Sequence, residues 1–318
     1  MRIFVYLTLL FPLAAAPLAR AATAHLHPRH TTWLLSFAAV ILAATSCGAL
    51  GLLAMAALVR IPLLGRLGHW STTVVSSGDS TSNGIALGAG ILFGAALLAT
   101  TTFVVLRTHA LVDAFGHARR LPGDQNLVIT PDAAADAYTV PGRPGRIVVS
   151  TGMLDALDEP GRRALLAHEH AHLTGRHYIY TTAARLAAVA NPLLRPLAGA
   201  VDYAVERWAD EHAARDLGDR RRVATAIATA AIAAKHTRPR RNGLLTLGAV
   251  FSRDGGLPLA GAGPVPRRVA ALLAPAQRTS PLILAVCLTL LALAGASALE
   301  AANDLQDLLS LAHAAVDH

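Results

Sequence analysis

The segment from residue 168 to residue 172 holds the side chains best suited to chemistry in this chain. It reads His168-Glu169-His170-Ala171-His172 and matches the pattern H-E-x-x-H. In a helix, His168 and His172 lie one turn apart on one face, so both imidazoles can reach a single zinc ion. Zinc lowers the pKa of a coordinated water molecule toward about 7, and Glu169 could take that proton and return it to a leaving amine. The spacing therefore predicts one zinc ion per chain and peptide hydrolysis, with His170 pointing elsewhere.

A third protein ligand is needed, because a catalytic zinc site has three such ligands and leaves a fourth position open. Glu206 and Asp210 are spaced i and i+4, so they share one helix face, and Asp202 extends the same stripe. Glu206 could be the ligand and Asp210 could orient a ligand histidine. The same spacing also fits a solvent-exposed acidic helix face, and the residues alone leave both interpretations open.

Local signals place both groups on helices. Asp158 and Pro160 mark the start of the helix that carries the histidines, and Gly175 suits its C-terminal end. A further helix at about 197–217 carries the two carboxylates. The candidate ligands are therefore expected to face each other from two helices.

A small β-sheet is expected before the first of these helices. Short strands are predicted at 126–129, 137–140 and 146–150, and the Pro- and Gly-rich turn 141–145 makes a hairpin of the last two. We expect Ile147–Ser150 to be an edge-like strand, able to pair with an extended substrate backbone.

The composition places much of the chain in a membrane. Of 318 residues, 53% are hydrophobic and 15% charged, whereas soluble domains carry about 25% charged residues. A bilayer core of roughly 30 Å needs about 20 apolar residues per helix, and four apolar stretches stand out. The expected division is a first transmembrane helix and short loop at 1–31, a second transmembrane helix at 32–60, a loop at 61–82, a third helix at 83–107, a zinc metalloprotease domain at 108–279, a fourth helix at 280–299 and a short tail at 300–318.

The orientation of the domain at 108–279 follows from arginines near the membrane ends. The first apolar stretch is either a retained helix or a cleaved signal peptide, because Ala19-Arg20-Ala21 resembles a cleavage site. Arginines cluster after the third stretch and before the fourth, whereas the tail is acidic, so the positive-inside rule predicts a cytoplasmic domain. The arginines concerned are Arg107, Arg119, Arg120, Arg267, Arg268 and Arg278.

The formal net charge of +8 raises the question of nucleic-acid binding. The arginines are scattered, and no basic run is interleaved with stacking aromatic residues, so no nucleic-acid partner is expected. Cys47 and Cys287 both lie in apolar stretches and lack a second cysteine at metal-binding spacing. We expect neither a disulfide framework nor a cysteine metal site.

The two motifs together resemble the signature of the membrane gluzincin peptidases. That group includes the HtpX and CAAX-processing Ste-type proteases and the BlaR/MecR antirepressor peptidases, and the likeness is closest to the BlaR/MecR type, with three N-terminal membrane helices, a cytoplasmic zinc domain and a fourth membrane helix. It covers roughly 121–273 in sequence and the rest in architecture only. The resemblance implies these roles: His168, His172 and Glu206 as zinc ligands, Glu169 as the base, and Asp210 as the supporting carboxylate.

One departure concerns the C-terminus. Family members of this type carry a penicillin-binding sensor domain beyond the fourth helix, but here only Ala301–His318 follow it, so β-lactam sensing is not expected. The leucines of this tail have helical spacing, which fits a short amphipathic helix on the membrane or on a partner, and equally a frayed terminus.

The expected fold is mostly α: a multi-pass membrane protein with four transmembrane helices and an α+β zincin-like (gluzincin) protease domain. The expected function is zinc-dependent endopeptidase activity at the cytoplasmic membrane face, on a transcriptional repressor or a membrane protein. Expected partners are a protein or peptide substrate, the lipid bilayer, and a signalling partner contacting the membrane helices or the tail. The alternative is a non-catalytic zinc-binding sensor or scaffold, which would have no use for an unligated base at Glu169. A transporter is disfavoured because the histidines lie outside every apolar stretch.

Overall fold

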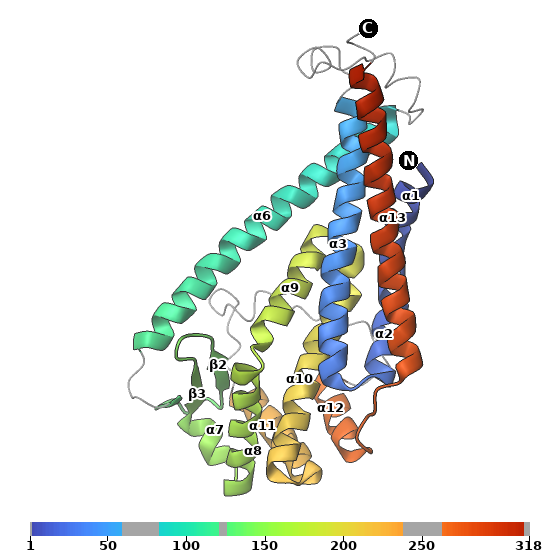
Figure 1. Ribbon diagram of the computed structural model, residues 1–318. Helices are drawn as coiled ribbons and strands as arrows, with labels where there is room; N and C mark the ends of the chain where they lie inside the picture. Colours follow the sequence, from blue (N-terminus) through green and yellow to red (C-terminus); the bar gives the residue numbers. More distant parts are fainter. Residues whose placement is uncertain (1, 59–82, 121–125, 238–262, 315–318) are drawn as a thin grey trace.

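The computed structural model describes residues 2–58, 83–120, 126–237 and 263–314 (Figure 1). It confirms a mostly helical chain with one small sheet. The predicted loop 61–82 lies outside the described residues. The elements are α1 (Arg2–Leu10), η1 (Phe11–Ala14), α2 (Ala15–His25), α3 (Pro28–Leu58), α6 (Asn83–Arg120), β1 (Leu127–Thr130), β2 (Ala137–Val140), β3 (Arg146–Ser150), α7 (Thr151–Ala156), α8 (Glu159–Thr174), α9 (His177–Ala190), η2 (Pro192–Leu194), α10 (Arg195–Leu217), α11 (Arg220–Thr237), α12 (Pro264–Leu273) and α13 (Pro281–Ala314).

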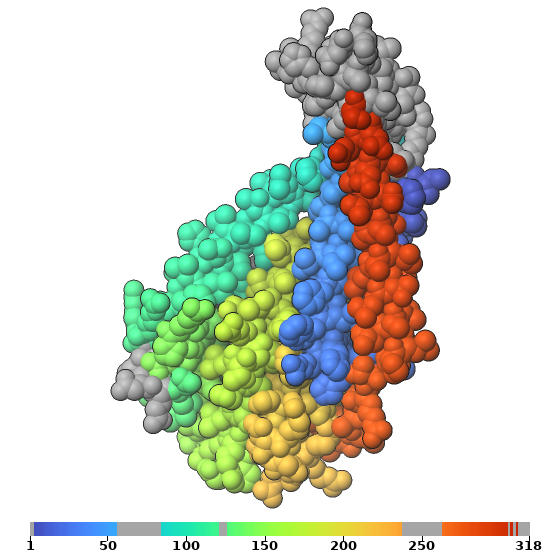
Figure 2. Space-filling model, in the orientation of Figure 1, coloured from blue at the N-terminus to red at the C-terminus, as the bar shows by residue number. Residues whose placement is uncertain are grey.

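Four helical stretches in the described part of the chain are long and apolar enough to cross a membrane: Ile3–His25, Pro28–Met55, Gly84–Arg120 and Pro281–Asp304. Prolines start two of them, because the missing N–H of Pro28 and of Pro281 is no loss in a first helical turn. Helices α3 and α13 pack along each other, and α6 leans away from them (Figure 1). In Figure 2 the blue and red helices α3 and α13 form a column that extends beyond the green and yellow part of the molecule.

Two helices run past the predicted membrane boundaries. Helix α6 continues without a break from the third apolar stretch to Arg120. Helix α13 continues past residue 299 to Ala314, so most of the expected tail belongs to the fourth long helix. Neither extension contains a proline that would end the helix. The boundaries at 107 and 299 therefore do not coincide with helix ends.

The sheet has the order β1-β3-β2. Strands β2 and β3 form the predicted antiparallel hairpin, and β1 pairs with β3 in parallel. The expectation that Ile147–Ser150 is an edge strand is wrong, because β3 is central and all five of its residues are buried. Its run of β-branched residues reflects burial on both faces. The edge strand that faces the rest of the site is β2.

The region at 108–279 shares its core with the membrane helices. Helices α9 and α10 form a hairpin that packs against α3, and α10 also packs against α2; their apolar residues join one buried cluster to which α13 contributes. At the tip of the hairpin, Asn191 Nδ2 donates to Ser46 Oγ at 3.0 Å, and Ser46 lies within the candidate span Pro28–Met55. The separate cytoplasmic domain stays a prediction, but the hairpin that carries the candidate site is anchored among membrane helices.

Candidate metal centre

Three candidate ligands meet between α8 and α10. The Nε2 atoms of His168 and His172 lie 3.1 Å apart. Glu206 places Oε2 at 3.6 Å from Nε2 of His168 and Oε1 at 3.6 Å from Nε2 of His172. Ligand atoms held about 2.0–2.1 Å from a zinc ion in tetrahedral geometry lie roughly 3.3 Å from one another. The spacing and the N/N/O donor set of this group therefore fit zinc.

Asp210 supports the first histidine. Its Oδ1 lies 3.0 Å from Nδ1 of His168, and its side chain is fully buried. Burial disfavours the protonated form of His168, but the hydrogen bonds with Asp210 and Glu206 outweigh burial and raise its pKa to about 10. Zinc binds neutral imidazole, so binding would displace this proton. Asp210 would then fix the ring with Nε2 toward the metal.

His177 supports the second histidine. It is buried, and its Nδ1 lies 3.0 Å from Nδ1 of His172. Burial lowers the pKa of His177 to about 3, so the ring is neutral and can accept a hydrogen bond from His172. The tight turn that returns the chain needs Gly175, where a Cβ would come within 2.4 Å of Nε2 of His177, and Arg176 with φ of 48°.

Two other polar residues of α10, Asp202 and His212, have partners outside the group of candidate ligands. Asp202 was placed on the stripe with Glu206, but it pairs with Arg185 at 3.1 Å. His212 Nε2 lies 3.5 Å from Oδ2 of Asp216, and both side chains are partly exposed. Asp202 shares a face of α10 with Glu206 but is held by Arg185 of α9, whereas His212 lies on a different face of the helix.

Glu169 is the candidate base, and a hydroxyl from the edge strand holds it. Thr139 on β2 donates to Oε2 of Glu169 at 2.6 Å. The Glu169 side chain is largely buried but lines the same cleft as the histidines. The strand therefore touches the carboxylate that would carry the proton. Sequence reasoning missed Thr139, because nothing local relates a strand residue to a helix 30 positions later.

Arg268 is the other residue that sequence reasoning missed. It comes from α12, and its Nη1 lies 2.8 Å from Oε2 of Glu206, while Nε and Nη2 bind the two oxygens of Asp210 at 2.8 and 2.6 Å. Burial would raise the pKa of Glu206, but the Arg268 cation and the two histidines hold it well below its usual range. Arg268 had been counted only as a positive charge near the membrane.

The candidate ligands open onto a cleft of about 1020 Å³. Its walls come from the end of α6, from β2, from the turn at 141–145, from the C-terminal part of α8 and from the start of α9. The lining residues outside the ligand set include Phe115, Arg119, Tyr138, Thr139, Arg143, Arg176, Tyr178 and Thr181. The cleft is large enough to accept an extended peptide segment.

Comparison with known proteins gives one result. The model of peptidase family M48 matches residues 105–194, which is less than half of the chain and includes His168, Glu169 and His172 but not Glu206. No curated protein and no solved structure matches the chain. The match and the cluster of His168, His172 and Glu206 together indicate a zinc metallopeptidase with a protein substrate, and the four candidate spans indicate a membrane protein.

Proposed function

We propose that this chain is a membrane-embedded zinc-dependent endopeptidase. His168, His172 and Glu206 hold one zinc ion, Glu169 is the catalytic base, and Asp210 orients His168. The observation that carries the proposal is the convergence of three ligand atoms, spaced as zinc requires, beside an unligated carboxylate in one cleft. A sensor or scaffold would need the three ligands but not Glu169.

The chemistry divides between the metal and the protein. When bound, zinc supplies a Lewis acid that polarises a carbonyl and makes water more acidic. Glu169 takes the proton from the attacking water and delivers it to the leaving amine. Thr139 holds Oε2 of Glu169, so the carboxylate keeps one orientation through both transfers.

The substrate backbone binds along β2. The described sheet ends at this strand, and Ala137, Tyr138 and Thr139 line the cleft. An extended peptide can therefore add to the free edge of β2 by main-chain hydrogen bonds. This places the scissile bond near Glu169, because Thr139 touches both the edge and the base. The role first assigned to Ile147–Ser150 passes to β2.

The site acts at the cytoplasmic face of the membrane, on a repressor or a membrane protein. Support comes from the arginines that flank the third and fourth apolar stretches and from the α9–α10 hairpin packed against α3. The resemblance to the BlaR/MecR type supports a repressor as substrate. A signalling partner would contact the membrane helices or the tail.

The test combines metal content with cleavage. The full chain is purified in detergent, zinc is measured per chain, and cleavage of casein is compared for wild type, Glu169→Ala and Glu206→Ala. Glu159→Ala is the matched control, because Glu159 is an exposed carboxylate on the same helix as Glu169. We expect about one zinc per chain, and loss of cleavage with retention of zinc in Glu169→Ala. A wild type that binds no zinc refutes the proposal, and cleavage that survives in Glu169→Ala removes Glu169 as the base.

A further inference from the structure

We infer that Arg268 is a positioning residue for the metal centre: its guanidinium fixes the Glu206 carboxylate in the orientation in which it binds metal. The inference rests on the proposed zinc site but not on peptide cleavage. It concerns the only arginine of the described chain that bridges Glu206 and Asp210.

One planar group makes three directed contacts here. Nε and Nη2 of Arg268 bind the two oxygens of Asp210, and Nη1 binds Oε2 of Glu206. Oε1 of Glu206 lies 3.6 Å from Nε2 of His172, and Oε2 lies 3.6 Å from Nε2 of His168. Arg268 therefore anchors Oε2 and holds the carboxylate with one oxygen beside each imidazole.

The same guanidinium also acts on His168 indirectly. Asp210 accepts both hydrogen bonds from Arg268 and lies 3.0 Å from Nδ1 of His168. Arg268 thus fixes one ligand directly and another through Asp210. A bidentate arginine–carboxylate pair restrains both angle and distance, which a point charge does not.

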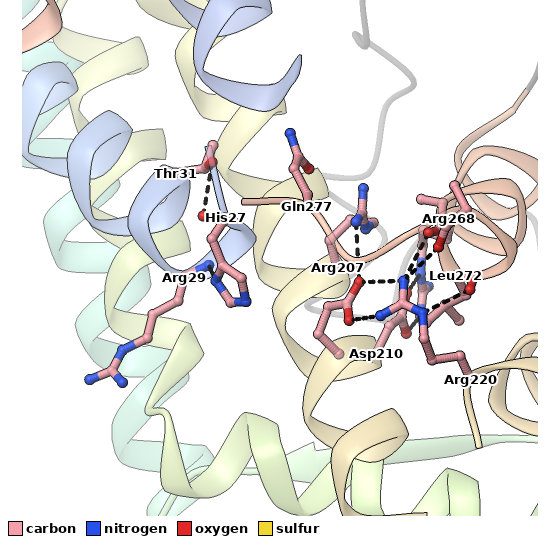
Figure 3. Close-up of polar contacts among 12 residues, drawn as sticks. His27, Arg29, Thr31, Arg207, Asp210, Arg220, Arg268, Leu272 and Gln277 are labelled. Carbon is pink, nitrogen blue, oxygen red and sulfur yellow. Dashed lines mark hydrogen bonds and ion pairs between the residues drawn. The ribbon is translucent and has the colours of Figure 1, made fainter. Parts of the chain in front are cut away.

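Burial and anchoring make the arrangement rigid. The side chain of Arg268 is 12% exposed and that of Asp210 is fully buried, so water competes little for these hydrogen bonds. Helix α12 is held in place, since Arg220 donates to the carbonyls of Ala271 and Leu272 at its C-terminal end. Figure 3 shows Arg268, Asp210, Arg220 and Leu272 gathered beside α10.

A simpler role would be charge neutralisation of the Glu206 and Asp210 carboxylates. Lysine could also neutralise charge, but its compact ammonium cannot make the same planar set of three contacts. The two roles therefore predict different results for Arg268→Lys. Arg267 is the matched control, because it is the next residue of α12 and stacks over the ring of Tyr203 at 4.3 Å, outside the ligand set.

The experiment measures zinc affinity of the full chain in detergent after metal removal, by competition with a chelating indicator. We expect Arg268→Ala and Arg268→Lys each to weaken zinc binding by about 10–100-fold, as loss of groups that orient metal ligands does. Arg267→Ala should stay close to wild type. Wild-type affinity in Arg268→Lys overturns the inference in favour of charge neutralisation, and wild-type affinity in Arg268→Ala overturns it outright. If Arg268→Ala does not fold, the Arg268→Lys comparison decides alone.

A spectroscopic measurement separates geometry from affinity. Co²⁺ replaces zinc, and its visible absorption is strong in four-coordinate sites and weak in six-coordinate sites. We expect the saturated Arg268→Lys protein to differ from wild type and Arg267→Ala to match it. An identical spectrum for Arg268→Lys would contradict the inference. Failure of the wild type to cleave casein despite zinc binding would refute the protease and leave the role of Arg268 standing.

Discussion

Helix α10 carries acidic side chains on two sides, and the two sides use arginines differently. On one side, Glu206 and Asp210 share Arg268 from α12. On the other side, Glu211 pairs with Arg207 of its own helix at 3.3 Å and with Arg220 of α11. Both sides obey the rule that buried carboxylates are paired.

The two sides differ in which carboxylate oxygens the arginines occupy. Both oxygens of Glu211 accept from arginines, and Arg220 also donates to main-chain carbonyls of α12. Glu206 has one oxygen held by Arg268, and its other oxygen lies next to His172. A saturated carboxylate is a structural clamp, whereas a partly saturated one beside imidazoles can bind a metal. The Glu206 side chain is also the more exposed of the two, at 39% against 7% for Glu211.

The largest expected effect is on zinc binding, where substitutions of Glu206 and Glu211 should differ. Glu206→Gln should weaken zinc binding by more than about 100-fold, because loss of the outer partners of ligands alone costs about 10–100-fold. Glu211→Gln should bind zinc as wild type does. Zinc titration of both detergent-solubilised variants checks this. Equal losses in the two variants would show that Glu206 is no ligand.

For the free energy of unfolding, Glu211 should matter more than Glu206. Glu211→Gln leaves Arg207 and Arg220 without their buried partner, so it should lower the free energy of unfolding by about 3–5 kcal/mol. Chemical unfolding in detergent measures the loss, with exposed Glu159→Gln as a control expected within about 0.5 kcal/mol of wild type. A loss below about 1 kcal/mol would mean that the clamp is not structural.

The stability of the metal-free protein should depend on pH through His168, which lies on the Glu206 and Asp210 side of α10. The pKa of His168 is raised from 6.5 to about 10 in the folded chain. Below pH 6.5 the ring is protonated in both the folded and the unfolded state, and this stabilising contribution is lost as the pH rises toward about 10. The unfolding midpoint of chelator-treated protein should therefore fall over that range.

Two controls accompany the pH measurement. The variant His212→Gln should show the same fall of the unfolding midpoint with pH as the metal-free wild type. Zinc-loaded protein should not show this fall, because metal binding requires the neutral His168 ring. A flat profile for the metal-free wild type would contradict the ion pairs of His168 with Asp210 and Glu206.

The smallest expected effect tests whether the α9–α10 hairpin depends on α3. Ser46→Ala removes the acceptor of Asn191 and should cost about 0.5–1.5 kcal/mol of unfolding free energy while zinc affinity stays unchanged. Unfolding and zinc titration of one preparation check both values. A drop in zinc affinity would show that the membrane contact reaches the metal centre.

Periodicity accounts for most of what could be predicted. Four apolar stretches of membrane-spanning length, a capped helix with His168 and His172 one turn apart, and a second helix with Glu206 and Asp210 one turn apart are local properties of a 3.6-residue repeat. The β2–β3 hairpin follows in the same way from turn residues between β-branched runs.

Chain pairings over long sequence distances could not be predicted. Arg268 reaches Asp210 across 58 positions, and β1 enters the sheet beside β3 and not beside β2, which moves the free edge to the other strand. His177 needed the left-handed turn at Arg176 to fold back on His172. None of these contacts leaves a periodic signal.

The sequence by itself determined which residue types face one way on each helix, because helix geometry fixes neighbours three and four positions apart. The tertiary structure decided which of those faces meet, which carboxylate is saturated by arginine and which is left toward the imidazoles. That decision depends on how helices α8, α10 and α12 pack, and packing is a property of the whole chain.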